Sequence, residues 1–426
     1  MFISYFTERP YQDPSSGFFG GIGLPLTDLS LSNKEYNPRI AAALHERYFE
    51  EMQRVEEVGF DGIILNEHHS TPFCMAGVMD VEAAILAQIT KRAKIVLLGN
   101  ILPIWDDPLR LAEELALIDV ISKGRLVTGW VRGTGRESIS HNAASPYNWE
   151  RFQEAHDLIV KTWTTDGPFR WEGQHFNYRY VNPWARPYQQ PRPPIWIPGV
   201  MSKNTVRWAA EHRYPYIMLA TALEPTRQSF DYYAECAREF GYEAGPQNIG
   251  YNFKVHVDET EELAEATARK YIEGPSNPFL EGNQGIVKPY LQNLPGMTSR
   301  TNILPTGMDP AAAAARGRAT PTATATPTAP PPPRGSYEDL TSKWSIVTGT
   351  PTTVIPKIRH VLEYLRPGNI IFWDGDGAMN HDDTMRSLRL FGEEVLPAVR
   401  EMGKELALTS AFEVDPATGK EIVPSV

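Results

Sequence analysis

Short apolar runs alternate with longer amphipathic segments along most of this 426-residue chain. The apolar runs have the length of buried β-strands, whereas the amphipathic segments repeat their apolar positions with the period of an α-helix. Between 40 and 58, for example, Leu44, Tyr48 and Met52 fall on one helical face. Strands are predicted at 1–6, 61–65, 94–99, 125–131, 194–198, 215–220, 249–257 and 369–373. Helices are predicted at 40–58, 80–91, 108–121, 149–163, 203–212, 224–241 and 382–401.

This alternation indicates βα units and a parallel sheet. Eight strands are the number at which such a sheet closes into a (β/α)8 barrel of the TIM type. We therefore predict the α/β class and a single barrel domain over residues 1–405, followed by a C-terminal tail at 406–426.

Two inserted segments interrupt the repeat. Residues 168–193 are rich in proline and aromatic residues, which predicts a hairpin followed by a proline-stiffened loop. Residues 274–345 form a longer inserted loop, and its Ala/Thr/Pro tract at 305–335 has too few apolar residues to bury a core. Long insertions are either lids or disordered linkers. We interpret the tract as a disordered spacer and its flanks as the better lid candidates.

Composition narrows the possible classes of function. The net charge is -11 and no basic run occurs, which argues against binding to a phosphate backbone and hence to nucleic acid. No apolar stretch approaches the roughly 20 residues of a membrane span, and residues 1–6 lack the basic start of a secretory leader. Cys74 and Cys236 are expected to be two reduced thiols. These observations predict a cytoplasmic enzyme that does not bind membranes.

Candidate chemistry follows several predicted strands at the barrel end where such folds place their active sites. Glu67-His68-His69-Ser70 follows strand 61–65, and Gly99-Asn100 ends strand 94–99. Arg132 follows strand 125–131, and the segment from Gly199 to Thr205 follows strand 194–198. A Ser at a helix start, free amides and an Arg together favour an anion. The arrangement predicts a phosphorylated cofactor in the barrel mouth.

The spacing of these residues does not favour a metal centre. His68 and His69 are adjacent and would point to opposite sides of an extended chain, so the pair is poorly arranged to share a metal ion. Either histidine could be a packing or solvated residue, and Asp residues beside glycine near 374–376 are most often turn formers. No complete dinucleotide fingerprint and no G-x-S-x-G motif occurs. We expect no metal site.

Four ordered segments resemble the bacterial luciferase-like flavin-dependent monooxygenases. They are GFDGIILNEHHSTPF (59–73), ISKGRLVTGWVRG (121–133), IVTGTPTTVIPKIRHVL (346–362) and SLRLFGEEVLPAV (387–399). The resemblance implies a (β/α) barrel that binds FMN or, in a related branch, a deazaflavin. It implies that His68 is the catalytic histidine near the flavin. The cofactor-binding residues that it implies are Gly99 and Asn100 under the ring, Thr134 against the ring, and Arg132, Met201, Ser202 and Thr205 at the phosphate.

Two positions depart from the family pattern. Val131 stands where luciferase α subunits carry a reactive cysteine, and Ala220 stands where the family places a bulky aromatic residue. These changes put luminescence in doubt and suggest a substrate space of different shape.

The function implied by the resemblance is a monooxygenase that uses reduced FMN and dioxygen, through a flavin peroxide, to oxygenate a small apolar organic substrate. His68 would exchange a proton near neutral pH. Because no nicotinamide fingerprint is evident, a separate flavin reductase is expected to supply the reduced FMN, and a homodimer is expected from the family. The alternatives are a deazaflavin-dependent hydride-transfer oxidoreductase, a non-catalytic flavin-binding protein, and an accessory subunit of a heterodimer, against which the retained EHH sequence speaks.

Overall fold

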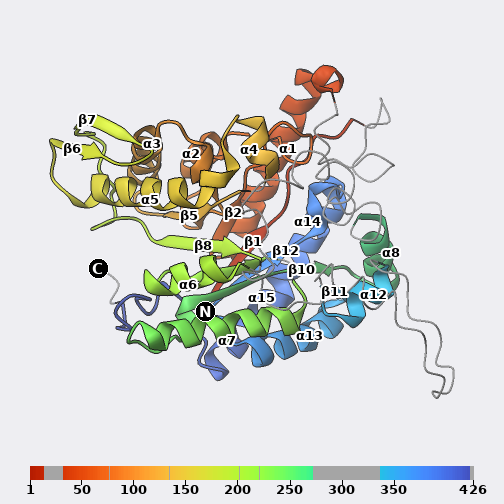
Figure 1. Ribbon diagram of the computed structural model, residues 1–426. Coiled ribbons are helices and arrows are strands. Elements are labelled where there is room, and N and C mark those ends of the chain that lie inside the picture. Colours follow the sequence, from red (N-terminus) through yellow and green to blue (C-terminus); the bar gives the residue numbers. More distant parts are fainter. Residues whose placement is uncertain are drawn as a thin grey trace, which may run out of the picture.

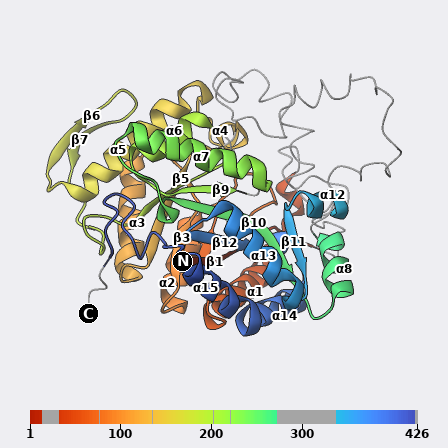
Figure 2. The same cartoon turned by 90° about the horizontal axis from the view of Figure 1, so that it is seen from below.

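Eight parallel strands close into a barrel that is surrounded by helices (Figure 1, Figure 2). The computed structural model describes residues 1–13, 32–75, 77–133, 135–200, 202–219, 221–271 and 336–422. The predicted (β/α)8 barrel is confirmed, and every predicted strand is present. The barrel strands are β1 (Phe2–Phe6), β2 (Gly62–Leu65), β3 (Lys94–Leu97), β5 (Leu126–Val131), β8 (Ile195–Gly199), β9 (Tyr216–Leu219), β10 (Ile249–Val257) and β12 (Asn369–Trp373).

The barrel closes between the first and last strands of the chain. All five residues of β1 pair in parallel with β12, from Phe2 opposite Asn369 to Phe6 opposite Trp373. The other edge of β1 pairs with β2, and the remaining strands follow in chain order around the barrel. Because all strands run the same way, their carboxyl ends meet at one end of the barrel.

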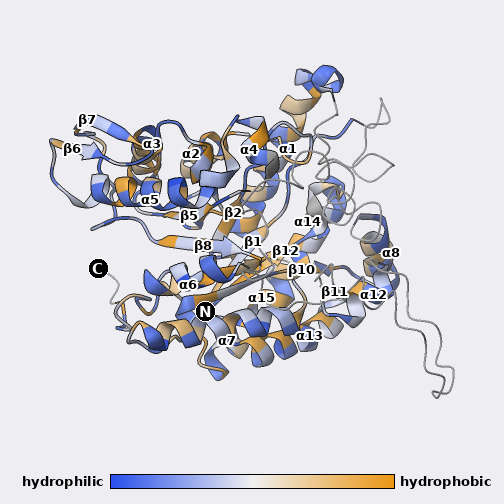
Figure 3. Ribbon diagram, viewed as in Figure 1, coloured by the Kyte–Doolittle hydropathy of each residue, from blue (hydrophilic) through white to orange (hydrophobic). Residues whose placement is uncertain are grey.

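Alternation along the strands divides the core in two. One set of buried side chains fills the barrel interior, and the other set packs between the strands and the surrounding helices. Figure 3 shows the hydrophobic residues along the strands and on the inner sides of the helices. The interior set is Phe2, Phe6, Ile64, Val96, Leu98, Val127, Trp196, Ile217, Ile371, Trp373 and Ala411.

The predicted helices are all present, most with ends shifted by only one or two residues. Side chains at the first positions explain where several begin: Asn37 and Asp107 cap helices whose first residue is proline, which cannot donate a backbone hydrogen bond. The helices are α1 (Pro38–Glu57), α2 (Met79–Ile89), α3 (Pro108–Ile121), α4 (Gly135–Ser140), α5 (Asn148–Thr164), α6 (Lys203–Glu211), α7 (Leu223–Glu239), α8 (Glu261–Tyr271), α12 (Tyr337–Ser342), α13 (Pro351–Leu365), α14 (His381–Leu390) and α15 (Leu396–Glu405).

Several elements were not predicted. Between the last two barrel strands, the chain forms helices α8, α12 and α13 and strand β11 (Ile346–Gly349). Strand β11 pairs with the last four residues of β10. Helix α13 continues through Pro356, a residue that usually signals a helix end. Residues 272–335, which hold the 305–335 tract, lie outside the described residues, whereas α12 occupies the end of the predicted 274–345 insertion.

The insertion at 168–193 contains the predicted hairpin. Strands β6 (Phe169–Glu172) and β7 (Asn177–Val181) pair antiparallel and lie beside α3 and α5 (Figure 1). The two-residue strand β4 (Asn100–Ile101) adds to β5.

No helix in the described ranges is long and apolar enough to cross a membrane. Cys74 and Cys236 are both buried, and neither forms a disulfide within the described residues.

The residues after α15 cover the end of the barrel opposite the candidate chemistry. The Phe412 ring lies 4.7 Å from that of Phe2 and 5.9 Å from that of Trp196, both in the barrel interior. The amino group of Met1 lies 2.7 Å from the Glu413 carboxylate. The predicted tail therefore contributes to the barrel floor.

Candidate functional site

The loop after β2 brings His68 against a carboxylate from the loop after β5. Nδ1 of His68 lies 3.1 Å from Oε1 of Glu137, which is on α4, and the imidazole ring packs against Phe73 at 4.9 Å. The backbone N–H of His69 donates to the other oxygen of Glu137 at 3.1 Å. An ionised carboxylate only accepts, so Nδ1 carries the hydrogen and Nε2 has the free lone pair. Glu137 thus fixes the tautomer and the orientation of His68.

His69 points to different partners. Its ring contacts His141 edge to face at 4.2 Å, and its Nε2 lies 3.9 Å from Glu67. Burial disfavours the charged imidazole, but the nearby Glu67 carboxylate, together with the Glu137 charge, outweighs burial and raises the pKa of His69. Through these contacts His69 packs between the end of α4 and the loop after β2, with a different set of partners from His68.

The backbone at Gly99 passes unusually close to the neighbouring strand. The peptide bond between Leu98 and Gly99 is cis, and a Cβ at position 99 would lie 2.3 Å from the carbonyl oxygen of Gly129. Only glycine fits there. The next residue, Asn100, is fully buried, and its Nδ2 lies 3.2 Å from both oxygens of Asp80. The amide nitrogen of Asn100 therefore donates its hydrogen bonds to Asp80 on α2.

Asp80 should make the stability of the protein depend on pH. Burial, together with the Glu67 charge, raises the pKa of Asp80 to about 8, although the Asn100 bond opposes the shift. The folded state then holds a proton that the unfolded chain loses near pH 4, so this stabilisation is present below pH 4 and is lost as the pH rises to about 8. We expect Asp80→Asn to unfold at higher urea concentration than the parent at pH 8, with a smaller gain at pH 5. Exposed Asp106→Asn is the control, and a gain that does not change with pH would contradict the assignment.

Arg132 and Ser202 meet between β5 and α6, as their positions after neighbouring strands predict. Nη2 of Arg132 lies 3.2 Å from Oγ of Ser202, and the guanidinium lies over the Trp149 ring at 5.3 Å. Ser202 is the N-cap of α6, as predicted, and its Oγ accepts from the backbone N–H of Thr205 at 3.4 Å. Thr205 is buried in the first turn of that helix.

This cluster has donors in excess of acceptors. In the described part of the chain, no carboxylate pairs with Arg132, and burial lowers the pKa of its guanidinium. The Tyr216 hydroxyl interacts electrostatically with Arg132 and has no hydrogen-bond partner among the same residues. A phosphate would supply both the negative charge and the acceptor oxygens that this cluster lacks, so the residues present fit the phosphate of FMN.

Two of the predicted cofactor-binding residues, Thr134 and Met201, lie outside the described residues, as does Ala220. Val131 ends β5 and is half-buried beside Arg132.

A buried ion pair that the sequence did not reveal lies beneath the His68 loop. Nε of Arg9 lies 2.8 Å from the Glu82 carboxylate, and its Nη2 donates to the backbone carbonyl of Asn66 at 2.6 Å. The Asn66 side chain donates to Glu8 at 2.7 Å. Arg9 is fully buried, so these bonds tie the segment after β1 to the loop that carries the histidines. Nothing in the local sequence distinguishes Arg9 from a surface arginine.

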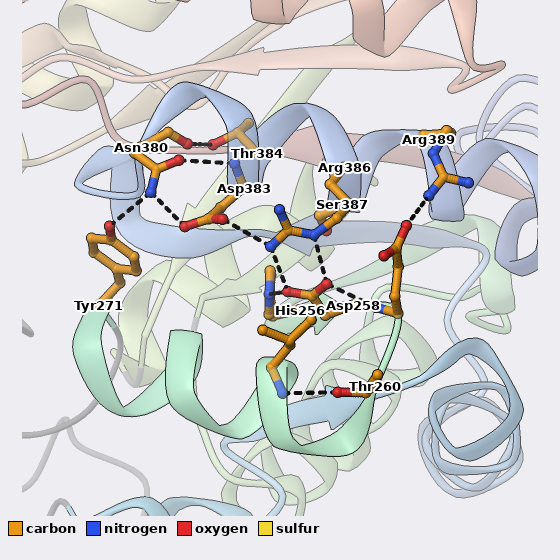
Figure 4. Close-up of polar contacts among 12 residues, drawn as sticks. His256, Asp258, Thr260, Tyr271, Asn380, Asp383, Thr384, Arg386, Ser387 and Arg389 are labelled. Atoms are coloured by element: carbon orange, nitrogen blue, oxygen red, sulfur yellow. Dashed lines mark hydrogen bonds and ion pairs between the residues drawn. The ribbon is translucent and has the colours of Figure 1, made fainter.

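A second buried network ties α14 to the carboxyl ends of β10 and β12. Figure 4 shows the part between α14 and the end of β10. Nδ1 of His256 lies 2.8 Å from Asp374, whose other oxygen accepts from the Ser387 hydroxyl at 2.6 Å. Asp258 accepts two bonds from Arg386, at 2.7 and 2.9 Å. Burial opposes the charged imidazole, yet Asp374 and Asp258 raise the pKa of His256 to about 9. Asp374 is thus part of an ionic network, whereas the sequence suggested a turn former.

Comparison with known proteins identifies a protein family that this chain matches. The family model described as luciferase-like monooxygenase matches residues 40–366. The alkanal monooxygenase alpha chain of Photorhabdus luminescens is 28% identical over 218 residues, which are 51% of this chain and 60% of that protein. The chain therefore spans less than two thirds of that relative's length.

Two solved structures share the fold. The oxygenating constituent of 3,6-diketocamphane monooxygenase from Pseudomonas putida, a type II Baeyer-Villiger monooxygenase in complex with FMN, has a TM-score of 0.64 and 19% identity. That likeness covers 87% of this chain and 96% of the other. An F420-dependent secondary alcohol dehydrogenase has a TM-score of 0.59 and 16% identity, covering 94% and 99%.

Proposed function

Because the chain belongs to the luciferase-like monooxygenase family, we propose that it is an FMN-dependent monooxygenase that acts with dioxygen on a small apolar organic substrate. The observation that carries the proposal is the cluster of Arg132, the N-terminus of α6 at Ser202, and the Tyr216 hydroxyl, which has more donors than acceptors. This is the environment that a phosphate monoester requires.

The proposed role of His68 is to hold and move a proton. Reduced FMN, when bound, supplies the activation of dioxygen. Glu137 keeps the hydrogen of His68 on Nδ1, so Nε2 is the atom that can accept a proton. Leu98 and Trp373, both in the apolar interior set near the carboxyl ends of their strands, favour an apolar substrate and help to exclude water.

Carbonyl compounds should be tried first as substrates. One relative is named as an alkanal monooxygenase, and one structural neighbour is a Baeyer-Villiger enzyme. Aliphatic aldehydes and cyclic ketones therefore form the first test panel.

Because the sequence lacks a nicotinamide fingerprint, a separate flavin reductase would supply the reduced FMN. A homodimer in the cytoplasm remains the expectation, and light scattering would measure the oligomeric state.

Loss of the phosphate contacts should weaken FMN binding selectively. We expect Arg132→Ala to raise the Kd for reduced FMN by about 10- to 100-fold, the range for a lost hydrogen bond to a charged group. Ser202→Ala should raise it by less, because one neutral hydroxyl is removed. The measurement is an anaerobic fluorescence titration, and Arg207→Ala, on the exposed side of α6, is the matched control.

Riboflavin provides the internal comparison, because it lacks the phosphate. Its affinity should be the same for the parent and for Arg132→Ala. Equal losses for FMN and riboflavin, or no loss for FMN, would contradict the phosphate assignment. A phosphate-bearing deazaflavin should be titrated in parallel; if it binds more tightly than FMN, hydride transfer becomes the favoured reaction.

A further inference from the structure

Three potential metal ligands meet on the outside of the barrel, away from the proposed flavin site. His156 and Asp157 are consecutive residues of α5, and His212 is the C-cap of α6. One nitrogen or oxygen atom from each of the three lies within 4.8 Å of the others. The sequence separates the two histidines by a strand, a hairpin and a helix, so no local motif reveals the cluster.

The second nitrogen of His212 is already held in the manner of metal-binding histidines. Its Nδ1 lies 2.9 Å from the backbone carbonyl of Trp208, and a carbonyl only accepts, so Nδ1 carries the hydrogen. The lone pair is then on Nε2, the atom left for a ligand bond. Metal-binding histidines almost always donate their other N–H to such a partner.

His156 is anchored in the same way. Its Nε2 lies 2.9 Å from the Tyr214 hydroxyl, and its Nδ1 lies 2.7 Å from Oδ1 of Asp157. A cation would replace the hydrogen that Nδ1 and Oδ1 now share. The Nε2 hydrogen of the other tautomer would then be donated to the Tyr214 hydroxyl, which can accept as well as donate.

Packing holds both rings in place while leaving a path to solvent. The His212 ring lies 4.2 Å from the Trp208 ring and 5.4 Å from the Tyr214 ring, and the two imidazole rings are 5.0 Å apart. His156 is buried, but the Asp157 side chain is 62% exposed.

We propose that His156, Asp157 and His212 form a binding site for a divalent transition-metal ion that links α5 to α6. Two imidazoles and one carboxylate suit Zn²⁺, Co²⁺, Ni²⁺ or Cu²⁺, whereas Mg²⁺ and Ca²⁺ prefer oxygen ligands throughout. Three protein ligands leave at least one position for water. The site does not depend on the proposed monooxygenase activity.

Arg192 opposes the binding of a cation. Its guanidinium lies over the Tyr214 ring at 5.2 Å, and its charge acts on His156. Arg192→Gln should therefore bind the metal more tightly than the parent does. A variant that gains affinity also shows that the site, and not general damage to the fold, controls binding.

The test is equilibrium dialysis of the full chain against Zn²⁺ after chelator treatment, together with the visible d–d spectrum of the Co²⁺-loaded protein. The parent should retain one Zn²⁺ per chain and show an intense Co²⁺ spectrum. Tyr214→Phe should lower the affinity by about 10- to 100-fold, the range for an outer-shell partner, and His212→Gln and Asp157→Asn by at least as much. His360→Gln, a histidine on α13, is the matched control and should bind as the parent does.

Two results would overturn the proposal. One is a parent that retains no more Zn²⁺ than His212→Gln retains. The other is a loss in His360→Gln as large as the loss in His212→Gln, which would show binding to histidines in general. Circular dichroism of each variant checks that the fold is intact, and Arg192→Gln gives a second readout if a ligand variant is unstable.

Discussion

Replacing His68 with alanine should lower kcat/KM for substrate oxygenation by about 10²- to 10⁴-fold, the usual contribution of a positioned acid or base. FMN should bind as it does to the parent, because the phosphate cluster at Arg132 and Ser202 is formed by other strands. The measurement is the yield of oxygenated product when protein loaded with reduced FMN meets dioxygen and members of the aldehyde and ketone panel. A His68→Ala variant that oxygenates at the parent rate would remove the proposed role.

Glu137→Gln separates orientation from proton transfer. The glutamine oxygen can still accept from Nδ1 of His68, but the glutamine NH2 group cannot accept from the backbone N–H of His69 as the second carboxylate oxygen does, and the negative charge is lost. The expected result is a smaller loss of kcat than in His68→Ala, because His68 keeps an acceptor for its Nδ1 hydrogen. A loss as large as in His68→Ala would mean that the carboxylate charge itself, and not only the orientation of His68, is required.

Removing Asp374 should cost about 3–5 kcal/mol of unfolding free energy at pH 7, because breaking a buried pair leaves its partner charge uncompensated. In Asp374→Ala, the fully buried His256 would keep only Asp258, 3.6 Å away and already bonded to Arg386. Urea denaturation measures the difference. Glu393→Ala breaks an exposed pair with Arg389 and is the control, with an expected cost below about 1 kcal/mol.

The same variant should change how stability depends on pH. The folded pKa of His256, about 9, lies above the ordinary value of 6.5. Its contribution is therefore fully present below pH 6.5 and is lost as the pH rises through 9. The difference between the parent and Asp374→Ala should shrink between pH 7 and pH 9.5. An unchanged difference would mean that His256 is neutral in the folded protein.

The fold could be predicted because it depends on a repeating pattern of residues, whereas the missed elements lack that pattern. Strand β11 is not one of the eight barrel strands and pairs with the end of β10, and α13 contains Pro356. Neither feature can be distinguished from a loop until the partner elements are known. Tertiary packing, and not the local preference of the residues, determines that these segments form a strand and a helix.

The candidate site divides in the same way. Arg132 and Ser202 follow neighbouring barrel strands, so their meeting follows from strand order. Glu137 could not be found, because α4 is an extra turn whose position depends on the loop after β5. The metal ligands His156 and His212 come from helices that only the finished barrel brings together. The roles of His68, Gly99 and Asn100 remain predictions.

The floor of the barrel has a consequence for biosynthesis. β1 leaves the ribosome before the other barrel strands but lies between β2 and β12, and Phe412 covers Phe2 and Trp196 from a segment that is made after β12. Pairings so distant in sequence form late and slowly. Until β12 and the tail emerge, the nascent chain exposes one edge of β1 and the aromatic residues of the floor, which are aggregation-prone surfaces. A chaperone that holds the nascent chain until β12 and the segment with Phe412 emerge should therefore increase the yield of folded protein.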